Sequence, residues 1–236
     1  MTNTRLQFVA AITVFLLAGC TDTATPDSET ATFSTMPGAI SKPIIFDDTR
    51  RQLSLQYLKD RYGLEPSEPT ITPRMVVLHW TAIPTMEETF AVFNPAELPG
   101  KRQDVMSAGA LNVSSHYLVD RDGTIYQLLP ELTFARHVIG LNHSAFGIEN
   151  VGNGTDLPLT DAQLESNVAI IRYLNSKYGL EYLIGHYEYA KFDGHPLWLE
   201  KDSGYRTEKT DPGESFMKRI REIVADLELE GSPAAL

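Results

Sequence analysis

Apolar side chains recur along the chain in short runs bounded by polar turns, and the spacing within each run predicts its secondary structure. The run from Met75 to His79 is apolar at nearly every position, which is typical of a strand covered on both faces of its sheet. Asp122-Gly123 stands between two further apolar segments and predicts a hairpin. We therefore expect strands at 75–79, 115–120, 124–129, 146–151 and 182–184.

Three other segments have helical spacing. Thr160 and Gln163 form a capping box that begins a helix, and Gly179 ends it. The apolar face of this helix consists of Leu164, Val168, Ile171 and Leu174. Helices are predicted at 86–93, 160–177 and 216–229. Because strands and helices are interleaved, we expect a single-domain α/β fold with a central mixed β-sheet flanked by helices.

The first residues have the layout of a secretion signal, which we assign to 1–19. Arg5 supplies a positive charge, and the apolar run from Phe8 to Leu17 is too short to span a bilayer permanently. Leu17-Ala18-Gly19-Cys20 resembles the bacterial lipobox, in which the cysteine becomes the lipidated first residue of the mature protein. An ordinary signal peptide that contains a cysteine is the alternative. Thr21, rather than aspartate, follows Cys20, which favours the outer membrane over the inner membrane.

Composition divides the rest of the chain. Residues 20–42 have too few large apolar side chains to offset the entropy of ordering, so we expect a flexible tether from Cys20. Residues 43–230 have the right length for one domain with a sizeable core, and 231–236 are expected to be a disordered tail. The 20 basic and 31 acidic residues argue against nucleic acid or anionic lipid headgroups as partners. We expect a monomer.

Three residues carry groups that bind metals in hydrolases, and each has a structural alternative. His79 and His186 follow apolar strands, where a histidine is more often a core or surface residue than a ligand. Asp211 precedes Pro212-Gly213 and could be a turn residue or a helix cap. Metal sites in hydrolases are commonly built from histidine and carboxylate groups, which leave a coordination position for water. Singly, none of the three identifies a site.

Four motifs together are more specific. In chain order they are Leu78-His79-Trp80-Thr81, Phe146-Gly147-Ile148-Glu149-Asn150, Gly185-His186 and Lys209-Thr210-Asp211-Pro212-Gly213. This set resembles the zinc N-acetylmuramoyl-L-alanine amidases of the type 2 class, which share a fold with peptidoglycan recognition proteins and bacteriophage lysozyme-amidases. The resemblance spans residues 76–212. With the lipobox, it points to the AmiD-like branch, which consists of outer-membrane lipoproteins.

The resemblance implies a role for each matching residue. His79, His186 and Asp211 would be the Zn²⁺ ligands, and the carboxylate at 211 favours an active enzyme over a protein that only binds. Glu149 would carry protons between water and the leaving amine, and Lys209 would stabilise the oxyanion. From the residues alone, a surface-facing Glu149 and a solvated Lys209 are the alternatives.

Other polar residues have weaker counterparts in the family. By resemblance, His137 lines the groove and contacts substrate. Asn142 helps to bind the glycan or the stem peptide, with a turn-forming asparagine as the alternative. His116 is expected to be structural. His143 and His195 match no family position.

The segment 187–208, between the second and third ligands, is longer than in compact members of the family. Its aromatic residues are Tyr189, Phe192, Trp198 and Tyr205. They could form a wall over the cleft that contacts glycan, or packing that caps the sheet. The segment also contains His195, a rival to His186 as a ligand.

The activity that the resemblance implies is hydrolysis of the amide between N-acetylmuramic acid and L-alanine. The substrate would be peptidoglycan or its fragments, and the anchor at Cys20 would hold the enzyme on the outer membrane, facing the periplasm. A zinc peptidase acting within the stem peptide is the rival enzyme. A non-catalytic peptidoglycan-binding lipoprotein is the rival from another class.

Overall fold

The computed structural model describes residues 1–2, 35–100 and 108–234. The predicted signal peptide beyond its first two residues, Cys20 and most of the predicted tether lie outside the described residues, as do 235–236 of the predicted tail. Within the described ranges, none of the helices combines the length and the apolar character that crossing a membrane requires.

Six strands form one mixed sheet in the order β1-β4-β3-β5-β2-β6. They are β1 (Ile40–Ser41), β2 (Met75–Trp80), β3 (Tyr117–Val119), β4 (Ile125–Gln127), β5 (Ala145–Asn150) and β6 (Tyr182–Gly185). β3 and β4 form the predicted antiparallel hairpin, and all other neighbours in the sheet are parallel. The prediction of a mixed-sheet α/β domain is confirmed.

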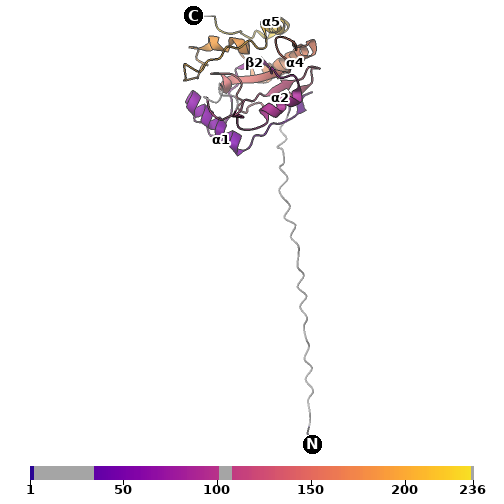
Figure 1. Cartoon of the computed structure of the whole chain (residues 1–236), viewed down its shortest axis with the longest axis vertical. Coiled ribbons are helices and arrows are strands. Elements are labelled where there is room, and N and C mark those ends of the chain that lie inside the picture. Colours follow the sequence, from indigo (N-terminus) through magenta and orange to yellow (C-terminus); the bar gives the residue numbers. More distant parts are fainter. Residues whose placement is uncertain (3–34, 101–107, 235–236) are drawn as a thin grey trace. The chain divides into compact units, whose positions relative to one another are not determined.

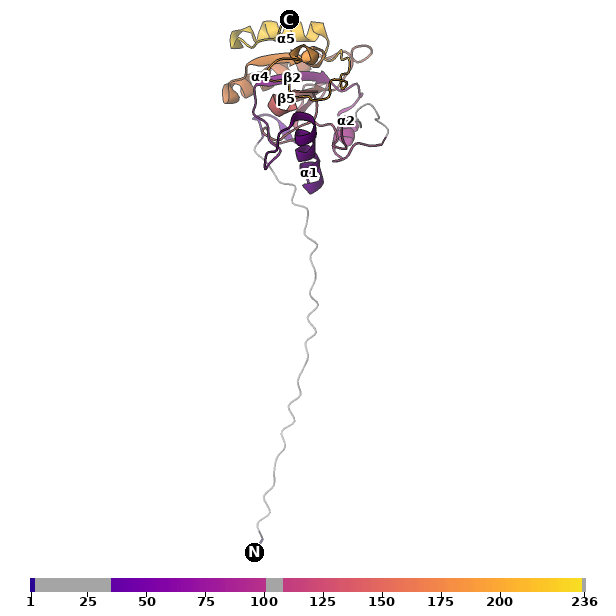
Figure 2. The ribbon, with the colours of Figure 1, turned by 90° about the vertical axis from the view of Figure 1, so that its left-hand side faces the viewer.

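Helices lie on both sides of this sheet (Figures 1 and 2). α4 (Asp161–Tyr178) and α5 (Glu214–Ile223) lie on one side of β2, and α1 (Asp48–Tyr57) and α2 (Met86–Phe93) lie on the other. Each face of the sheet is therefore covered, which explains why β2 and β5 are apolar along most of their length.

The central strand β2 contributes to a different cluster on each face. Val76 and Leu78 pack in the cluster that includes residues of α4 and α5. Met75 and Val77 pack in a second cluster, with residues of the 138–141 loop and of the 3₁₀ helix η3 (His186–Phe192). This alternation follows from the two-residue period of a strand. It places His79, two residues after Val77, on the second face.

The long helix α4 begins and ends as predicted. The Gln163 N–H donates to Thr160 Oγ1 at 3.1 Å, and the Thr160 N–H donates to Gln163 Oε1 at 3.0 Å. Gly179 follows the helix with a φ of 64°, in the left-handed region that favours glycine.

The closing helix is shorter than predicted, since α5 ends at Ile223 rather than at Leu229. A 3₁₀ turn, η4 (Ala225–Leu227), follows, because the chain must bend back to the sheet. There the Glu230 N–H donates to the Glu181 carbonyl at 2.8 Å, and the Leu183 N–H donates to the Glu230 carbonyl at the same distance.

Ordered structure also begins earlier than predicted. Met36 is buried, and its N–H donates to Gln127 Oε1 at 2.8 Å. β1 then pairs with β4 before the predicted start of the domain at residue 43. The strand has two exposed residues, so it leaves no apolar pattern in the sequence.

α1 is an additional, unpredicted helix, although the sequence contains the signals for its start and end. Asp47 caps the helix by accepting from the Arg50 N–H at 2.9 Å. A π-helical turn, η1 (Leu58–Tyr62), continues α1 and ends at Gly63. The buried Arg50 guanidinium donates to the Phe93 carbonyl at 2.7 Å, which joins α1 to the end of α2.

The fully buried His116 gives the fold a pH-dependent stability. Its Nδ1 accepts from the Gly147 N–H at 3.1 Å, and its Nε2–H donates to the Thr133 carbonyl at 2.9 Å, so a neutral ring uses both nitrogens. Burial lowers the pKa of His116 from 6.5 to about 4. As the pH falls below 6.5 the unfolded state therefore binds this proton first, and stability is lost progressively down to about pH 4.

We expect the free energy of unfolding to fall by roughly 2 kcal/mol more in the wild type than in His116→Gln between pH 7 and pH 5, at 1.36 kcal/mol per pKa unit. Urea denaturation of both proteins, with a chelator present, measures the difference. Equal losses in the two proteins would contradict the assignment to His116.

Candidate metal centre and cleft

The predicted site residues meet at the carboxyl-terminal edge of three neighbouring parallel strands. His79 on β2 is paired in register with Glu149 on β5. Leu78 is paired with Gly185 on β6, so His186, the next residue, stands beside His79. Because parallel strands end at the same edge of a sheet, these side chains share one rim.

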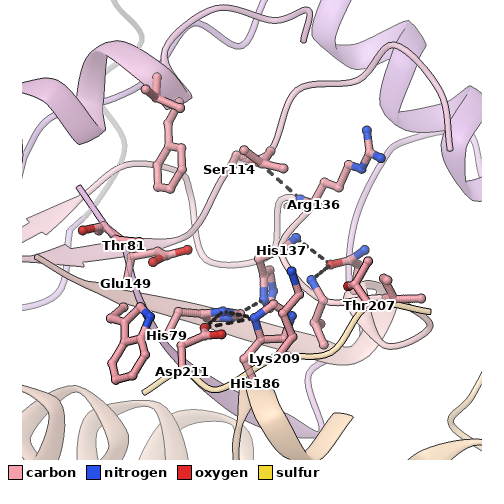
Figure 3. Close-up of a pocket in the computed structure, with 18 of the residues that line it drawn as sticks. His79, Thr81, Ser114, Arg136, His137, Glu149, His186, Thr207, Lys209 and Asp211 are labelled. Atoms are coloured by element: carbon pink, nitrogen blue, oxygen red, sulfur yellow. Dashed lines mark hydrogen bonds and ion pairs between the residues drawn. The ribbon is translucent and has the colours of Figure 1, made fainter. Parts of the chain in front are cut away.

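Two histidines and one aspartate converge at this rim (Figure 3). The Nδ1 atoms of His79 and His186 lie 3.0 Å apart, and Oδ2 of Asp211 lies 3.2 Å and 3.0 Å from them, respectively. All three side chains are buried. In a tetrahedral zinc site with ligand distances of about 2.0–2.1 Å, neighbouring ligand atoms stand roughly 3.3 Å apart. The donor set, within the part of the chain that the structure describes, therefore fits a zinc ion.

The electrostatics of the group suit a cation. Burial and the neighbouring His79 ring lower the pKa of His186 to about 4, although Asp211 opposes the shift. Burial raises the pKa of Asp211, but the two histidine rings outweigh burial and hold it well below its usual value. At neutral pH, His186 thus offers a lone pair and Asp211 a negative charge, the states in which they bind metal.

Asp211 reaches the rim because the preceding segment is fastened to the domain. The Tyr189 hydroxyl donates to the Thr207 carbonyl and accepts from the Thr207 N–H, both at 2.8 Å. The Tyr187 N–H donates to the Asp211 carbonyl at 3.0 Å. These bonds hold the segment at both ends, which fixes the position of the third ligand.

Between the two ligands, the segment 187–208 mainly packs against the sheet. Tyr189 and Phe192 are fully buried, and Trp198 stacks on Tyr189 with ring centroids 6.1 Å apart. Tyr205 reaches the cleft. His195 packs edge-on against Phe192 and is not part of the metal-binding group, so the choice of His186 over His195 agrees with the geometry.

A cleft of about 270 Å³ opens over this group. Glu149 and Lys209 line the cleft and are half-buried, and Figure 3 shows Lys209 beside the histidines. Ser114 and Arg136 lie at the opposite end of the view. A group that can hold a cation thus stands beside a carboxylate and an ammonium group, the combination that hydrolysis of an amide requires.

The sequence matches a known protein family over most of the domain. A model of the family described as N-acetylmuramoyl-L-alanine amidase (Amidase_2) matches residues 69–214, more than half of the chain. The chain belongs to this amidase family. The matched residues include all the predicted metal-binding and catalytic positions.

The similar proteins each match only part of this chain. The endolysin of Escherichia phage T7 is 32% identical over 94 residues, which are 38% of this chain and 62% of the endolysin, so the chain spans about three fifths of that relative. The amidase LysC from Clostridium intestinale URNW is 26% identical over 68% of this chain and 88% of its own, with a TM-score of 0.46. The E. coli amidase AmiD, solved with an anhydro-N-acetylmuramic acid peptide, is 20% identical. The match covers 70% of this chain and 60% of the AmiD chain, with a TM-score of 0.47.

His137 lines the amidase-family cleft, but the protein engages both of its ring nitrogens. Burial, together with His79 and His116, lowers the pKa of His137 well below 6.5, so the ring is neutral at physiological pH. Contact of the ring with substrate remains a prediction.

Asn142 is fully buried in the same domain. Its Oδ1 accepts from the N–H groups of His137 and Val138, both at 2.8 Å, and its Nδ2 donates to the Tyr62 hydroxyl at 2.9 Å. These bonds hold the backbone beside the cleft. Substrate binding by Asn142 also remains a prediction.

Tyr57 and Arg136 also line the amidase-family cleft, and neither was predicted as a site residue. Tyr57 comes from the unpredicted α1, whose N-cap and closing glycine were the available signal. Arg136 lies with its guanidinium 5.0 Å from the Tyr57 ring centroid and donates to the Gly109 carbonyl at 3.2 Å. Nothing in its local sequence marks it, since a single arginine in a loop is usually solvated.

Proposed function

We propose that this protein is a zinc-dependent N-acetylmuramoyl-L-alanine amidase, which hydrolyses the amide between N-acetylmuramic acid and L-alanine in peptidoglycan or its fragments. The observation that carries the proposal is the buried group of His79, His186 and Asp211 beneath the cleft, inside the region that matches the family. When bound there, zinc supplies a Lewis acid that lowers the pKa of water and polarises the scissile carbonyl.

The residues around the metal group carry the remaining chemistry. Glu149 accepts a proton from the attacking water and returns it to the alanine nitrogen as the C–N bond breaks, which makes the amine a better leaving group. Lys209 places its ammonium group beside the carbonyl oxygen, where negative charge develops as the water oxygen bonds to carbon. The register that pairs Glu149 with His79 supports the first role, and the position of Lys209 in the cleft supports the second.

We propose also that the protein is a lipoprotein of the AmiD-like branch. The motif Leu17-Ala18-Gly19-Cys20 supports cleavage before Cys20 and lipidation of that residue. Thr21 after the cysteine supports the outer membrane. The enzyme would act as a monomer on peptidoglycan in the periplasm.

Purified sacculi test the activity. The protein without residues 1–20 is incubated with sacculi, with and without a chelator, and the released fragments are identified by mass. We expect free stem peptides that begin with L-alanine, and no release with the chelator. Shortened stems still attached to sugar would instead indicate a peptidase, and binding without any release would indicate a non-catalytic protein.

Loss of the Lys209 charge is expected to slow catalysis without loss of metal. Lys209→Met should lower kcat by about 10²–10³-fold, the effect of removing one oxyanion-stabilising group. Turnover of a soluble muropeptide and zinc titration measure the two properties. Lys201→Met, at an exposed position in the preceding segment 187–208, is the control and should match the wild type. A wild-type kcat in Lys209→Met would contradict the role.

A further inference from the structure

The ring of His137 stands directly behind a predicted metal ligand. Its Nδ1 lies 3.0 Å from Nε2 of His79, and its Nε2 lies 3.3 Å from the Ala145 carbonyl oxygen. The rings of His79 and His137 meet edge to face, at 88°. Both contacts are hydrogen bonds, and together they restrict the orientation of the His137 ring.

The direction of these bonds follows from the carbonyl. A carbonyl oxygen only accepts, so the Nε2 of His137 must carry the hydrogen. A neutral imidazole has one N–H, and the Nδ1 of His137 is therefore the acceptor. The Nε2 of His79 must then donate to it, and a neutral His79 ring has no second hydrogen to place on its Nδ1. This Nδ1 is the atom that faces His186 and Asp211.

We propose that His137 is a positioning residue of the metal site, which fixes the tautomer and the orientation of His79 so that Nδ1 presents its lone pair to the metal. This inference rests on the proposed zinc site. It assigns His137 a role through His79, whereas the family resemblance implied a contact with substrate. Partners of this kind, which accept from the second nitrogen of a liganding histidine, orient the ring and raise its affinity for metal.

The packing of the His137 ring against Gly147 independently supports this positioning role. A Cβ added to Gly147 would stand 2.8 Å from Cγ and 2.9 Å from Cδ2 of His137, closer than real contacts allow. The glycine of the Phe-Gly-Ile-Glu strand thus leaves room for this ring. In addition, Oδ1 of Asn142 accepts from the backbone N–H of His137 at 2.8 Å. The ring of His137 therefore packs on Gly147, and a hydrogen bond to Asn142 fixes the His137 backbone.

Nitrogen NMR of the ¹⁵N-histidine-labelled wild-type protein tests the tautomer directly. We expect the Nε2 of His79 to be protonated and its Nδ1 unprotonated in the metal-free protein, with the zinc shift on Nδ1 after loading. A His79 ring protonated on Nδ1, or zinc bound through Nε2, would overturn the inference. Because the metal-free spectrum is informative by itself, absence of zinc binding would contradict the proposed function and leave this test standing.

Zinc affinity of three variants, measured by competition with a chromophoric chelator, tests the consequence. His137→Leu should weaken binding by about 10–100-fold. His137→Asn should retain most of the affinity, because its Oδ1 can occupy the place of Nδ1 and accept from His79. Gly147→Ala should weaken binding although it touches no ligand. Wild-type affinity in a folded His137→Leu protein would overturn the proposal.

The matched control is His195→Leu, which removes another partly buried ring that contacts no metal ligand. It should bind zinc as the wild type does. Thermal unfolding of each metal-free variant shows whether it is folded. Equal losses in His137→Asn and His137→Leu would indicate a packing role for the ring, and would count against tautomer control.

Discussion

Replacing Asp211 with asparagine is expected to abolish both zinc binding and hydrolysis of peptidoglycan while the domain stays folded. Oδ2 of Asp211 lies within 3.2 Å of both histidine Nδ1 atoms, and an amide in its place has no charge to balance a dication. Loss of the Lewis acid removes several kcal/mol of transition-state stabilisation, which at 1.36 kcal/mol per tenfold is about a thousandfold or more in rate. The fold should survive because the backbone carbonyl of Asp211, which accepts from Tyr187, is unchanged.

Zinc content by competition with a chelator and release of stem peptides from sacculi measure the two losses. Asp193→Asn is the control, since Asp193 lies in the same part of the chain but pairs with Arg206 at 2.9 Å. It should behave as the wild type. An Asp211→Asn protein that released stem peptides at the wild-type rate would remove this residue from the metal site.

Replacing Glu149 with glutamine is expected to lower kcat by about 10²–10⁴-fold, the usual contribution of a positioned proton carrier. Zinc affinity should not change, because Glu149 is not one of the three clustered ligands. Its position opposite His79 in the sheet register keeps the side chain over the same rim. The amide of glutamine has the same shape but cannot take a proton from water.

Kinetics on a soluble muropeptide, paired with zinc titration, separate the two properties. Glu181→Gln is the control, because Glu181 pairs with Arg74 at the opposite end of β6. Full turnover by a zinc-loaded Glu149→Gln protein would show that another group carries the proton. The proposed amidase activity would not be contradicted by that result.

Several features of this protein follow from the sequence alone. The apolar run of β2 and the Asp-Gly hairpin are local patterns, and the structure reproduces them within one or two residues. The capping box of α4 is also local, because its two side chains are three residues apart. The ordered motif set identified the family that residues 69–214 match.

Only the tertiary structure shows how the predicted site residues come together. His79 lies 107 residues from His186 and 132 from Asp211, and no local spacing reports a contact over such distances. The parallel register of β2, β5 and β6 brings them together, because these strands end at one edge. The same applies to α1. The sequence contains the capping signal of this helix, but Tyr57 lines the cleft only because the helix packs beside it in the folded domain.

The role of His137 is the clearest case. The sequence shows a histidine before the Gly-Ile-Glu strand, and its two hydrogen bonds appear only once the ring is seated on Gly147. Sequence thus determined which chemical groups this protein has and which elements carry them. The fold decided their distances, their burial and the direction of their hydrogen bonds, because these properties depend on packing between segments that are far apart in the chain.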